Sequence, residues 1–383
     1  MSGRTLILGG GFGGIAAGVE LRRLLEPDHE VVLVDRKPAF AMGLRKLWEL
    51  VGTEAVAEGS RERRLLERHG IEFVQAEITS IDAAGRSAET SAGTLSADHF
   101  VIALGAVSRP DLVPGLVEHG HDVWAFAGVG PAAGALADFE GGLIVVLVAG
   151  APYPCPPAPY ECALHLDEHL RSRGLRERTE VAVSTLQPML MPNAGRAGSD
   201  WMAEQLAVRG IRCQVGTKVE RVESAGIVLT DGAEESFDLL IAVPPHRAPD
   251  VLSVSGLTGP HGWIDVDAGT LATSHAGVYA IGDVTLIPLA NGLPFPKAGV
   301  MAELQGLRVA RAIAAEITGA EPPQPFDGKG HCPIELGTRS AARVDGNWYA
   351  TPEPIVTIDG PTAERAGEKA EFEREHLTRW FGD

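Results

Sequence analysis

The sequence has few cysteines, few aromatic residues and a shortage of positive charge. Its 383 residues include only four cysteines, and phenylalanine, tryptophan and tyrosine together make up 5%. The cysteines, at positions 155, 162, 213 and 332, lack the spacing of a zinc site, so we expect no metal. The 33 basic residues are outnumbered by 51 acidic ones, and the net charge of −18 argues against a nucleic-acid partner.

Long apolar runs are also missing. No run approaches the 18 residues that a membrane-spanning helix needs, so none is expected. A strand is predicted from residue 5 onward, which leaves no room for a secretory leader. We therefore expect a cytoplasmic protein, in which a disulfide is more often catalytic than structural.

A glycine-rich turn follows the strand predicted over 5–8. Its nucleotide-binding candidates are Gly9, Gly11, Phe12, Gly13 and Gly14, of which the first, second and last fit the G-x-G-x-x-G pattern. Asp35 ends the next strand about 20 residues later, where a carboxylate holds a ribose hydroxyl. Arg36 follows it as a further cofactor-binding candidate. The strand, turn, helix and acidic strand end together predict a dinucleotide site rather than a merely flexible turn.

Two later segments decide between FAD and NAD. FVIALG (100–105) and GVYAIGDV (277–284) are strands that end in Gly105 and in Gly282-Asp283. They resemble the secondary FAD motifs of the flavoproteins with two dinucleotide-binding domains. That resemblance implies an FAD cofactor whose ribityl chain binds Asp283; the alternative is an aspartate that caps a turn.

The alternation of helical and strand patterns predicts an α/β fold with two Rossmann-like domains. We expect a split FAD-binding domain at 1–110 and 237–330. An inserted Rossmann-like domain at 111–236 and a small C-terminal region at 331–383, with β segments followed by a helix, complete the chain.

The inserted domain lacks the features of a nicotinamide site. Its first strand runs into a loop with prolines at 152, 154, 156, 157 and 159, where a dinucleotide loop needs glycines. Proline has no N–H and cannot bind a pyrophosphate in this way. Its next strand, 180–184, ends without an acidic residue. We therefore expect a reductant other than NADH.

Two cysteines are candidates for redox chemistry. Cys155 lies among the prolines just before a helix, whose N-terminus should favour a thiolate. Cys332 lies in GKGHCPIELG at the start of the C-terminal β region. The alternatives are a small apolar loop residue and a core strand residue. Cys162 and Cys213 follow apolar patterns and are interpreted as core residues.

Three segments together resemble the sulfide:quinone oxidoreductases and the flavoprotein subunit of flavocytochrome c sulfide dehydrogenase. They are CPPAPYE (155–161), PFPKAGVMAELQG (294–306) and GHCPIELG (330–337). The resemblance implies a redox pair of Cys155 and Cys332 beside the flavin, with Cys332 attacking flavin C4a and Cys155 holding sulfane sulfur. The third cysteine that many members carry before the inserted domain is absent.

The resemblance also implies a function and further site residues. FAD would oxidise sulfide, or a related small thiol or persulfide, and pass electrons to a quinone. Glu161 is a candidate base, or else a first-turn glutamate that complements the helix dipole. Lys297 is expected beside the flavin, or else in solvent. The rival functions are a type II NADH dehydrogenase-like quinone reductase and a flavoprotein that binds sulfur species without turnover.

The C-terminal helix expected within 361–383 carries Phe372, Leu377, Trp380 and Phe381. These residues predict peripheral docking to the inner face of the cell membrane, where quinones reside. The alternative is a helix that packs back over the flavin domain or on a second subunit. We expect the acidic stretch 364–375 to be exposed, and His165 and His169 to share a solvated helix face.

Overall fold

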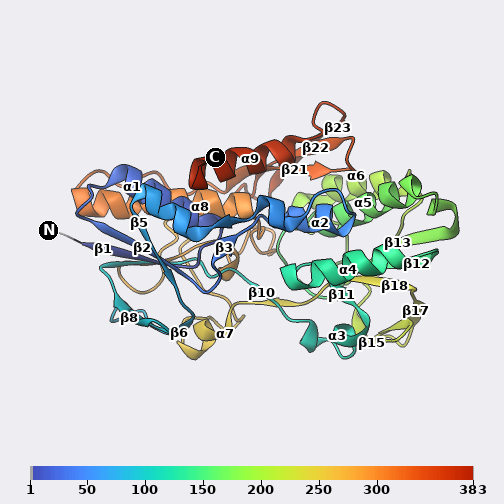
Figure 1. Cartoon of the computed structure of the whole chain (residues 1–383), viewed down its shortest axis with the longest axis horizontal. Helices are drawn as coiled ribbons and strands as arrows, with labels where there is room; N and C mark the ends of the chain where they lie inside the picture. The colour runs from blue at the N-terminus through green and yellow to red at the C-terminus, as the bar shows by residue number, and fades with distance from the viewer. Residues whose placement is uncertain (1–2, 383) are drawn as a thin grey trace.

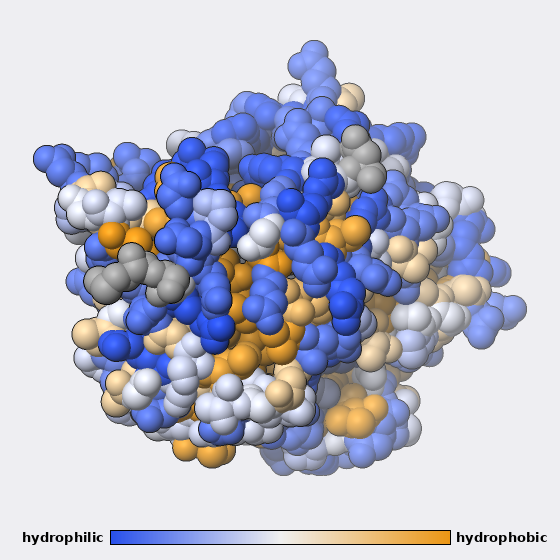
Figure 2. Space-filling view, turned by 60° about the vertical axis from the view of Figure 1, so that its left-hand side comes forward, coloured by the Kyte–Doolittle hydropathy of each residue, from blue (hydrophilic) through white to orange (hydrophobic). Residues whose placement is uncertain are grey.

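The computed structural model describes residues 3–382. Its elements build two parallel sheets side by side along the long axis of the molecule, with a small antiparallel sheet and the last helix above them (Figure 1). The mixed α/β fold with two Rossmann-like sheets is confirmed. One face is mostly hydrophilic, as the high net charge requires, with apolar side chains gathered near its middle (Figure 2).

The first sheet has the strand order β20-β9-β1-β2-β5, and every neighbour is parallel. The strands are β1 (Arg4–Leu8), β2 (Glu30–Asp35), β5 (Ile71–Gln75), β9 (His99–Ile102) and β20 (Val278–Ala280). Their valines, leucines and isoleucines are buried on both faces, which is typical of parallel sheets between helices. Helices α1 (Phe12–Leu24) and α8 (Gly299–Thr318) pack together on this sheet.

The second sheet, in the inserted region, is also parallel, with the order β11-β18-β12-β13-β14. Its elements are β11 (His121–Asp122), β12 (Gly142–Val148), β13 (Thr179–Thr185), β14 (Arg212–Val215) and β18 (Leu239–Val243), with helices α4 (Phe126–Asp138), α5 (Ala158–Ser172) and α6 (Gly195–Ala207).

The strand that follows the expected domain boundary at 236/237 belongs to the sheet of the inserted region. We assigned β18 to the FAD-binding segment, but it pairs with β12 along its whole length. The reason is its sequence, LLIAV, which is fully buried and belongs in a sheet centre. The division into domains otherwise stays a prediction.

The C-terminal region is a three-stranded antiparallel sheet followed by a helix. These are β21 (Lys329–Glu335), β22 (Ala341–Asn347), β23 (Ile355–Thr362) and α9 (Glu368–Phe381). Helix α9 returns over α1 and α8 (Figure 1).

The remaining elements are short. They are α2 (Arg45–Leu50), α3 (Leu116–His119), α7 (Asp250–Val254), β3 (Ala39–Phe40), β4 (Arg61–Glu62), β6 (Ile78–Asp82), β7 (Ser87–Thr90), β8 (Gly93–Ser96), β10 (Val107–Ser108), β15 (Val219–Glu223), β16 (Gly226–Leu229), β17 (Glu234–Ser236) and β19 (His246–Arg247).

Candidate active site

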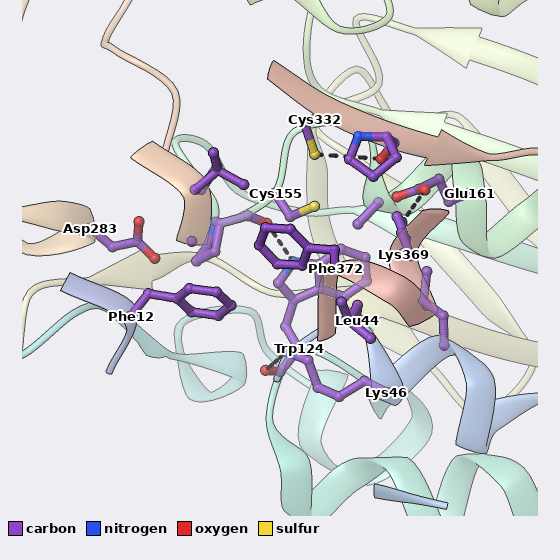
Figure 3. Close-up of a pocket in the computed structure, with 18 of the residues that line it drawn as sticks. Phe12, Leu44, Lys46, Trp124, Cys155, Glu161, Asp283, Cys332, Lys369 and Phe372 are labelled. Atoms are coloured by element: carbon purple, nitrogen blue, oxygen red, sulfur yellow. Dashed lines mark hydrogen bonds and ion pairs between the residues drawn. The ribbon is translucent and has the colours of Figure 1, made fainter. Parts of the chain in front are cut away.

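Cys155 and Cys332 line one cavity of about 260 Å³. Cys155 comes from the loop between β12 and α5, and Cys332 comes from β21, so the fold joins thiols that are distant in the sequence. Phe12, Asp283 and Phe372 border the same space (Figure 3). The two cysteines therefore share a cavity with residues from the predicted FAD motifs.

The loop holds Cys155 in a strained conformation. Its φ of +59° lies in the left-handed region, which costs a residue with a Cβ on the order of 1 kcal/mol. Two hydrogen bonds fix the loop: the Cys155 N–H donates to Lys297 O at 2.6 Å, and the Trp124 indole N–H donates to Pro154 O at 2.9 Å. Strain of this kind gathers at functional sites.

Both thiols are held in the protonated form by burial. Burial, and then the Glu161 carboxylate, raise the pKa of Cys155; burial also raises the pKa of Cys332 to about 11. Our expectation that a helix N-terminus favours a thiolate at Cys155 is therefore wrong, because the loss of hydration outweighs it. The Lys369 ammonium opposes this effect and lowers the pKa of each thiol, and Lys46 also lowers the pKa of Cys155.

Lys369 of α9 lies buried between two carboxylates, a feature that the sequence did not reveal. Its Nζ donates to Glu161 Oε1 and lies 3.8 Å from Glu335 Oε2. The same Glu335 oxygen accepts from the Trp48 indole N–H at 3.0 Å and lies 3.1 Å from His165 Nε2. Burial opposes the charge on Lys369, but the two carboxylates outweigh it and raise its pKa.

Glu161 joins the elements that carry the two cysteines. Its side chain is 1% exposed, and Oε1 accepts from Lys369 and from the Glu335 N–H, the latter at 2.7 Å. The carboxylate thus ties α5, which follows Cys155, to β21, which carries Cys332. A role for Glu161 as a base stays a prediction.

The histidines of α5 do not share a solvated face, so this expectation is wrong. His165 is 2% exposed and contacts Glu335, while His169 Nδ1 lies 3.1 Å from Val51 O. The cause is that α2 and β21 pack against this side of α5. Within residues 3–382 no cluster of histidine, cysteine or acidic residues has the geometry of a metal site.

The glycine-rich turn leaves room for a nucleotide at the start of α1. A Cβ on Gly14 would lie 1.9 Å from Gly9 O, so the close packing of this turn requires glycine. A Cβ on Gly11 would meet nothing within 4 Å, so the space in front of this residue is open. Gly13 packs toward the Ala302 carbonyl of α8. A diphosphate can therefore approach the first N–H groups of the helix.

Asp35 and Arg36 differ in their placement. Asp35 Oδ2 accepts from the Gly10 N–H at 2.8 Å and lies 3.5 Å from the Arg63 guanidinium. Arg63, which the sequence did not reveal, also donates to Gly10 O at 2.8 Å. The Arg36 side chain is 62% exposed and lies 3.8 Å from Glu77. The structure brings Asp35 to the turn and leaves Arg36 at the surface.

Asp283 offers an unpaired acceptor to the cavity. Its Oδ1 is buried and has no hydrogen-bond partner among residues 3–382, and burial raises the pKa of its carboxyl. Gly282 before it and Gly105 after β9 turn the chain with φ of +72° and +69°. A buried acceptor without a partner fits a ligand hydroxyl, as a ribityl chain supplies. These residues therefore fit FAD.

Lys297 is neither solvated nor aimed into the thiol cavity. Its Nζ donates to the carbonyls of Asp283 and Thr285, both at 2.7 Å, and lies 3.7 Å from the centre of the Trp263 ring. Burial lowers its pKa to about 8. The Lys297 side chain thus fixes the backbone at Asp283, and the Lys297 carbonyl accepts the hydrogen bond from the Cys155 N–H. Direct contact between Lys297 and the flavin stays a prediction.

A second lysine that the sequence did not reveal, Lys46 of α2, lines the cavity. Its Nζ donates to Trp124 O at 2.6 Å, and burial lowers its pKa to about 8. The segment RKLWEL carries no motif, so only the fold places this ammonium near Cys155.

The C-terminal helix packs back over the first sheet's helices. Trp380 and Phe381 are 1% and 2% exposed and contact the rings of Phe12 and Phe40. The expectation that the apolar end of the helix inserts into a membrane is therefore wrong for these residues. The stretch 364–375 is not wholly exposed either, because Lys369 lies in the core of the site. Within residues 3–382, no helix combines the length and apolar content needed to cross a bilayer.

The comparisons with known proteins identify a family. Residues 3–310 match the family model described as pyridine nucleotide-disulphide oxidoreductase. The chain belongs to this family. It is 23% identical to the mitochondrial sulfide:quinone oxidoreductase of Mus musculus, over 93% of this chain and 80% of that one.

A solved structure and a further relative are also similar to this chain. The crystal structure of the sulfide:quinone oxidoreductase from Aquifex aeolicus superposes with a TM-score of 0.89 at 23% identity, over 99% of this chain and 91% of that one. The type II NADH:quinone oxidoreductase of Staphylococcus aureus is 21% identical, over 82% of this chain and 83% of that one.

The chain is thus an FAD-dependent oxidoreductase that is similar to sulfide:quinone oxidoreductases. Its residues fit the cofactor independently, through the open turn at Gly11 and the unpaired acceptor of Asp283.

Proposed function

We propose that this enzyme oxidises sulfide, or a related small thiol or persulfide, through Cys155 and Cys332, and that its FAD passes the electrons to a quinone. The observation that carries the proposal is the shared cavity, which both cysteines line together with Asp283 and Phe12. The relatives from Mus musculus and Aquifex aeolicus are named for sulfide and quinone.

The two sulfur atoms can perform the first half of the reaction. A hydrosulfide ion attacks one sulfur of a Cys155–Cys332 disulfide; a new S–S bond forms a persulfide on that cysteine, and the old S–S bond breaks. The other cysteine leaves as a thiolate and keeps the bonding electron pair. The open turn at Gly11 and the free Asp283 acceptor would hold FAD, which would supply a two-electron acceptor at this cavity. On giving up two electrons, the thiolate and the persulfide sulfur would join in a new S–S bond.

Lys369 is placed to stabilise the leaving thiolate. Burial makes a bare thiolate unfavourable at either cysteine, and the Lys369 ammonium lowers the pKa of both. The attraction is strong because the site is shielded from water. Glu161 and Glu335 hold the ammonium in place and keep it charged.

A type II NADH:quinone reductase is the second candidate function, favoured by the Staphylococcus aureus relative. The loop between β12 and α5 speaks against it. The Cys155 N–H of this loop already donates to Lys297 O, and Tyr153 fills the loop's interior with 3% exposure. The loop's one glycine, Gly150, packs against the backbone of Pro245, so the loop lacks the series of glycine N–H groups that binds a pyrophosphate.

A cytoplasmic location at the inner face of the cell membrane is part of the proposal, because quinones reside in membranes. Since the apolar end of α9 is buried, any contact with the membrane must use another surface.

The test is anaerobic reduction of the bound flavin by sulfide, followed by absorbance. Cys332→Ser is expected to keep FAD bound and to abolish reduction by sulfide. Cys213→Ser, at a partly buried thiol outside the cavity, is the matched control and should react like the unmodified enzyme. Reduction of the Cys332→Ser enzyme at an unchanged rate would refute the role of the cysteine pair.

A further inference from the structure

A second hollow lies beyond Phe372. It is about 820 Å³ in volume and lies between α8, the C-terminal sheet and α9; we call it the α8–α9 groove. Phe372 and Val300 line both this groove and the thiol cavity. The groove and the cofactor cavity are therefore adjacent, with these side chains between them.

The floor of the groove combines apolar side chains with a ring of charged ones. Leu304, Leu307 and Ile355 supply apolar surface, and the ring of Phe372 contacts that of His376 at a tilt, with centroids 3.9 Å apart. The titratable and charged residues that line it are Glu303, Lys329, His331, Asp345, Glu375, His376 and Arg379. Among these, only Glu303 and His376 are less than one-tenth exposed.

His376 and Glu303 share one proton. His376 Nδ1 lies 2.7 Å from Phe372 O, and because a carbonyl only accepts, Nδ1 carries hydrogen. His376 Nε2 lies 2.8 Å from Glu303 Oε2, so the proton between them sits either on the ring or on the carboxyl. Arg379 donates to Glu303 Oε1 and fixes the carboxylate.

We propose that His376, held by Glu303, donates a proton to a quinone bound in the α8–α9 groove. Reduction of a quinone to a quinol takes two electrons and two protons. Reduced FAD, when bound, would supply the electrons and one proton. The second proton passes from the His376–Glu303 pair to a quinone oxygen, and solvent then reprotonates the pair. The inference rests on the proposed quinone acceptor.

The test separates proton delivery from electron transfer. The flavin is reduced anaerobically with dithionite, so sulfide chemistry plays no part, and reoxidation is followed by stopped flow with a short-chain quinone or with ferricyanide. Ferricyanide takes up electrons without protons. In His376→Gln, whose amide has no dissociable proton, reoxidation by quinone should slow by about 10²-fold, the usual size of general acid catalysis. Reoxidation by ferricyanide should not change.

The pH dependence adds a second readout. In the unmodified enzyme the rate of the quinone reaction should depend on pH, and this dependence should vanish in His376→Gln. Glu371→Gln, which alters an exposed carboxylate of α9 outside the groove, is the matched control and should retain both rate and pH profile.

Three outcomes would overturn the inference. They are an unchanged quinone rate in His376→Gln, an equal slowing with ferricyanide, and a pH profile that persists in the variant. A separate result would distinguish the two proposals. If sulfide does not reduce the flavin, but His376→Gln still slows reoxidation of the dithionite-reduced enzyme by quinone, sulfide is not the substrate and the role of His376 as proton donor is retained.

Discussion

Replacing Lys369 with methionine tests whether the buried ammonium holds the site together. The change leaves the carboxylates of Glu161 and Glu335 buried without their shared partner. Breaking a buried ion pair in this way typically costs about 3–5 kcal/mol. The pKa of Glu335 gives a separate estimate of the free energy that these contacts contribute. Burial alone would raise it, but Lys369, His165 and Trp48 lower it from 4.5 to about 2, which corresponds to about 3 kcal/mol.

The assay is urea unfolding with FAD in constant excess, because cofactor binding adds to the apparent stability. Lys369→Met should lose about 3 kcal/mol at pH 7. Arg374→Met is the control, because its ion pair with Glu371 is 70% and 60% exposed and contributes at most about 1 kcal/mol. Equal stability of the two variants would refute the reasoning.

The dependence on pH has a definite sign. A carboxyl whose pKa is lowered on folding stabilises the protein above its unfolded pKa, and the contribution is lost as pH falls through the folded value. For Glu335 the loss therefore spans pH 4.5 down to about 2. Lys369→Met should flatten this part of the stability profile, and an unchanged slope would show that Lys369 is not its cause.

Two further predictions concern the cavity. Asp283→Ala removes the unpaired acceptor and should weaken FAD binding roughly 10-fold, because one hydrogen bond is lost. The assay is an FAD titration of the apoprotein. Asp327→Ala, at the surface, is the control and should not change the affinity for FAD. Because burial lowers the pKa of Lys46 to about 8, its ammonium is present below that pH and lost above it. The rate of flavin reduction by sulfide should therefore fall between pH 7 and 9. In Lys46→Met this fall should be absent. If the variant keeps the same pH profile, Lys46 is not the group that causes it.

The parts of the site that depend on local sequence could be predicted. The turn at Gly9–Gly14 needs glycine because its backbone packs closely on itself, and this requirement leaves a recognisable spacing. Asp283 is recognisable because it follows a buried strand that ends in glycine. The redox role proposed for Cys155 and Cys332 comes from motif resemblance, and only the fold shows that they share a cavity.

The residues that were missed depend on contacts between distant elements. Lys369 stands in an acidic stretch and has the sequence context of a surface residue; it is buried because Glu161 and Glu335 neutralise it. One signal was available, since a lone lysine on the apolar side of an amphipathic helix needs a buried partner. The same reasoning applies to α9 as a whole. Its Trp380 and Phe381 are equally compatible with a membrane and with a protein core, and only the packing on Phe12 and Phe40 decides.

The measurement that tests the central claim most directly is the anaerobic absorbance spectrum of the bound flavin during separate additions of sulfide and of NADH. The account predicts that sulfide alone bleaches the flavin band and that a quinone restores it, while NADH has no effect. Bleaching by NADH with no response to sulfide would contradict it, and would mean that the proline-rich loop around Cys155 accepts a nicotinamide dinucleotide after all.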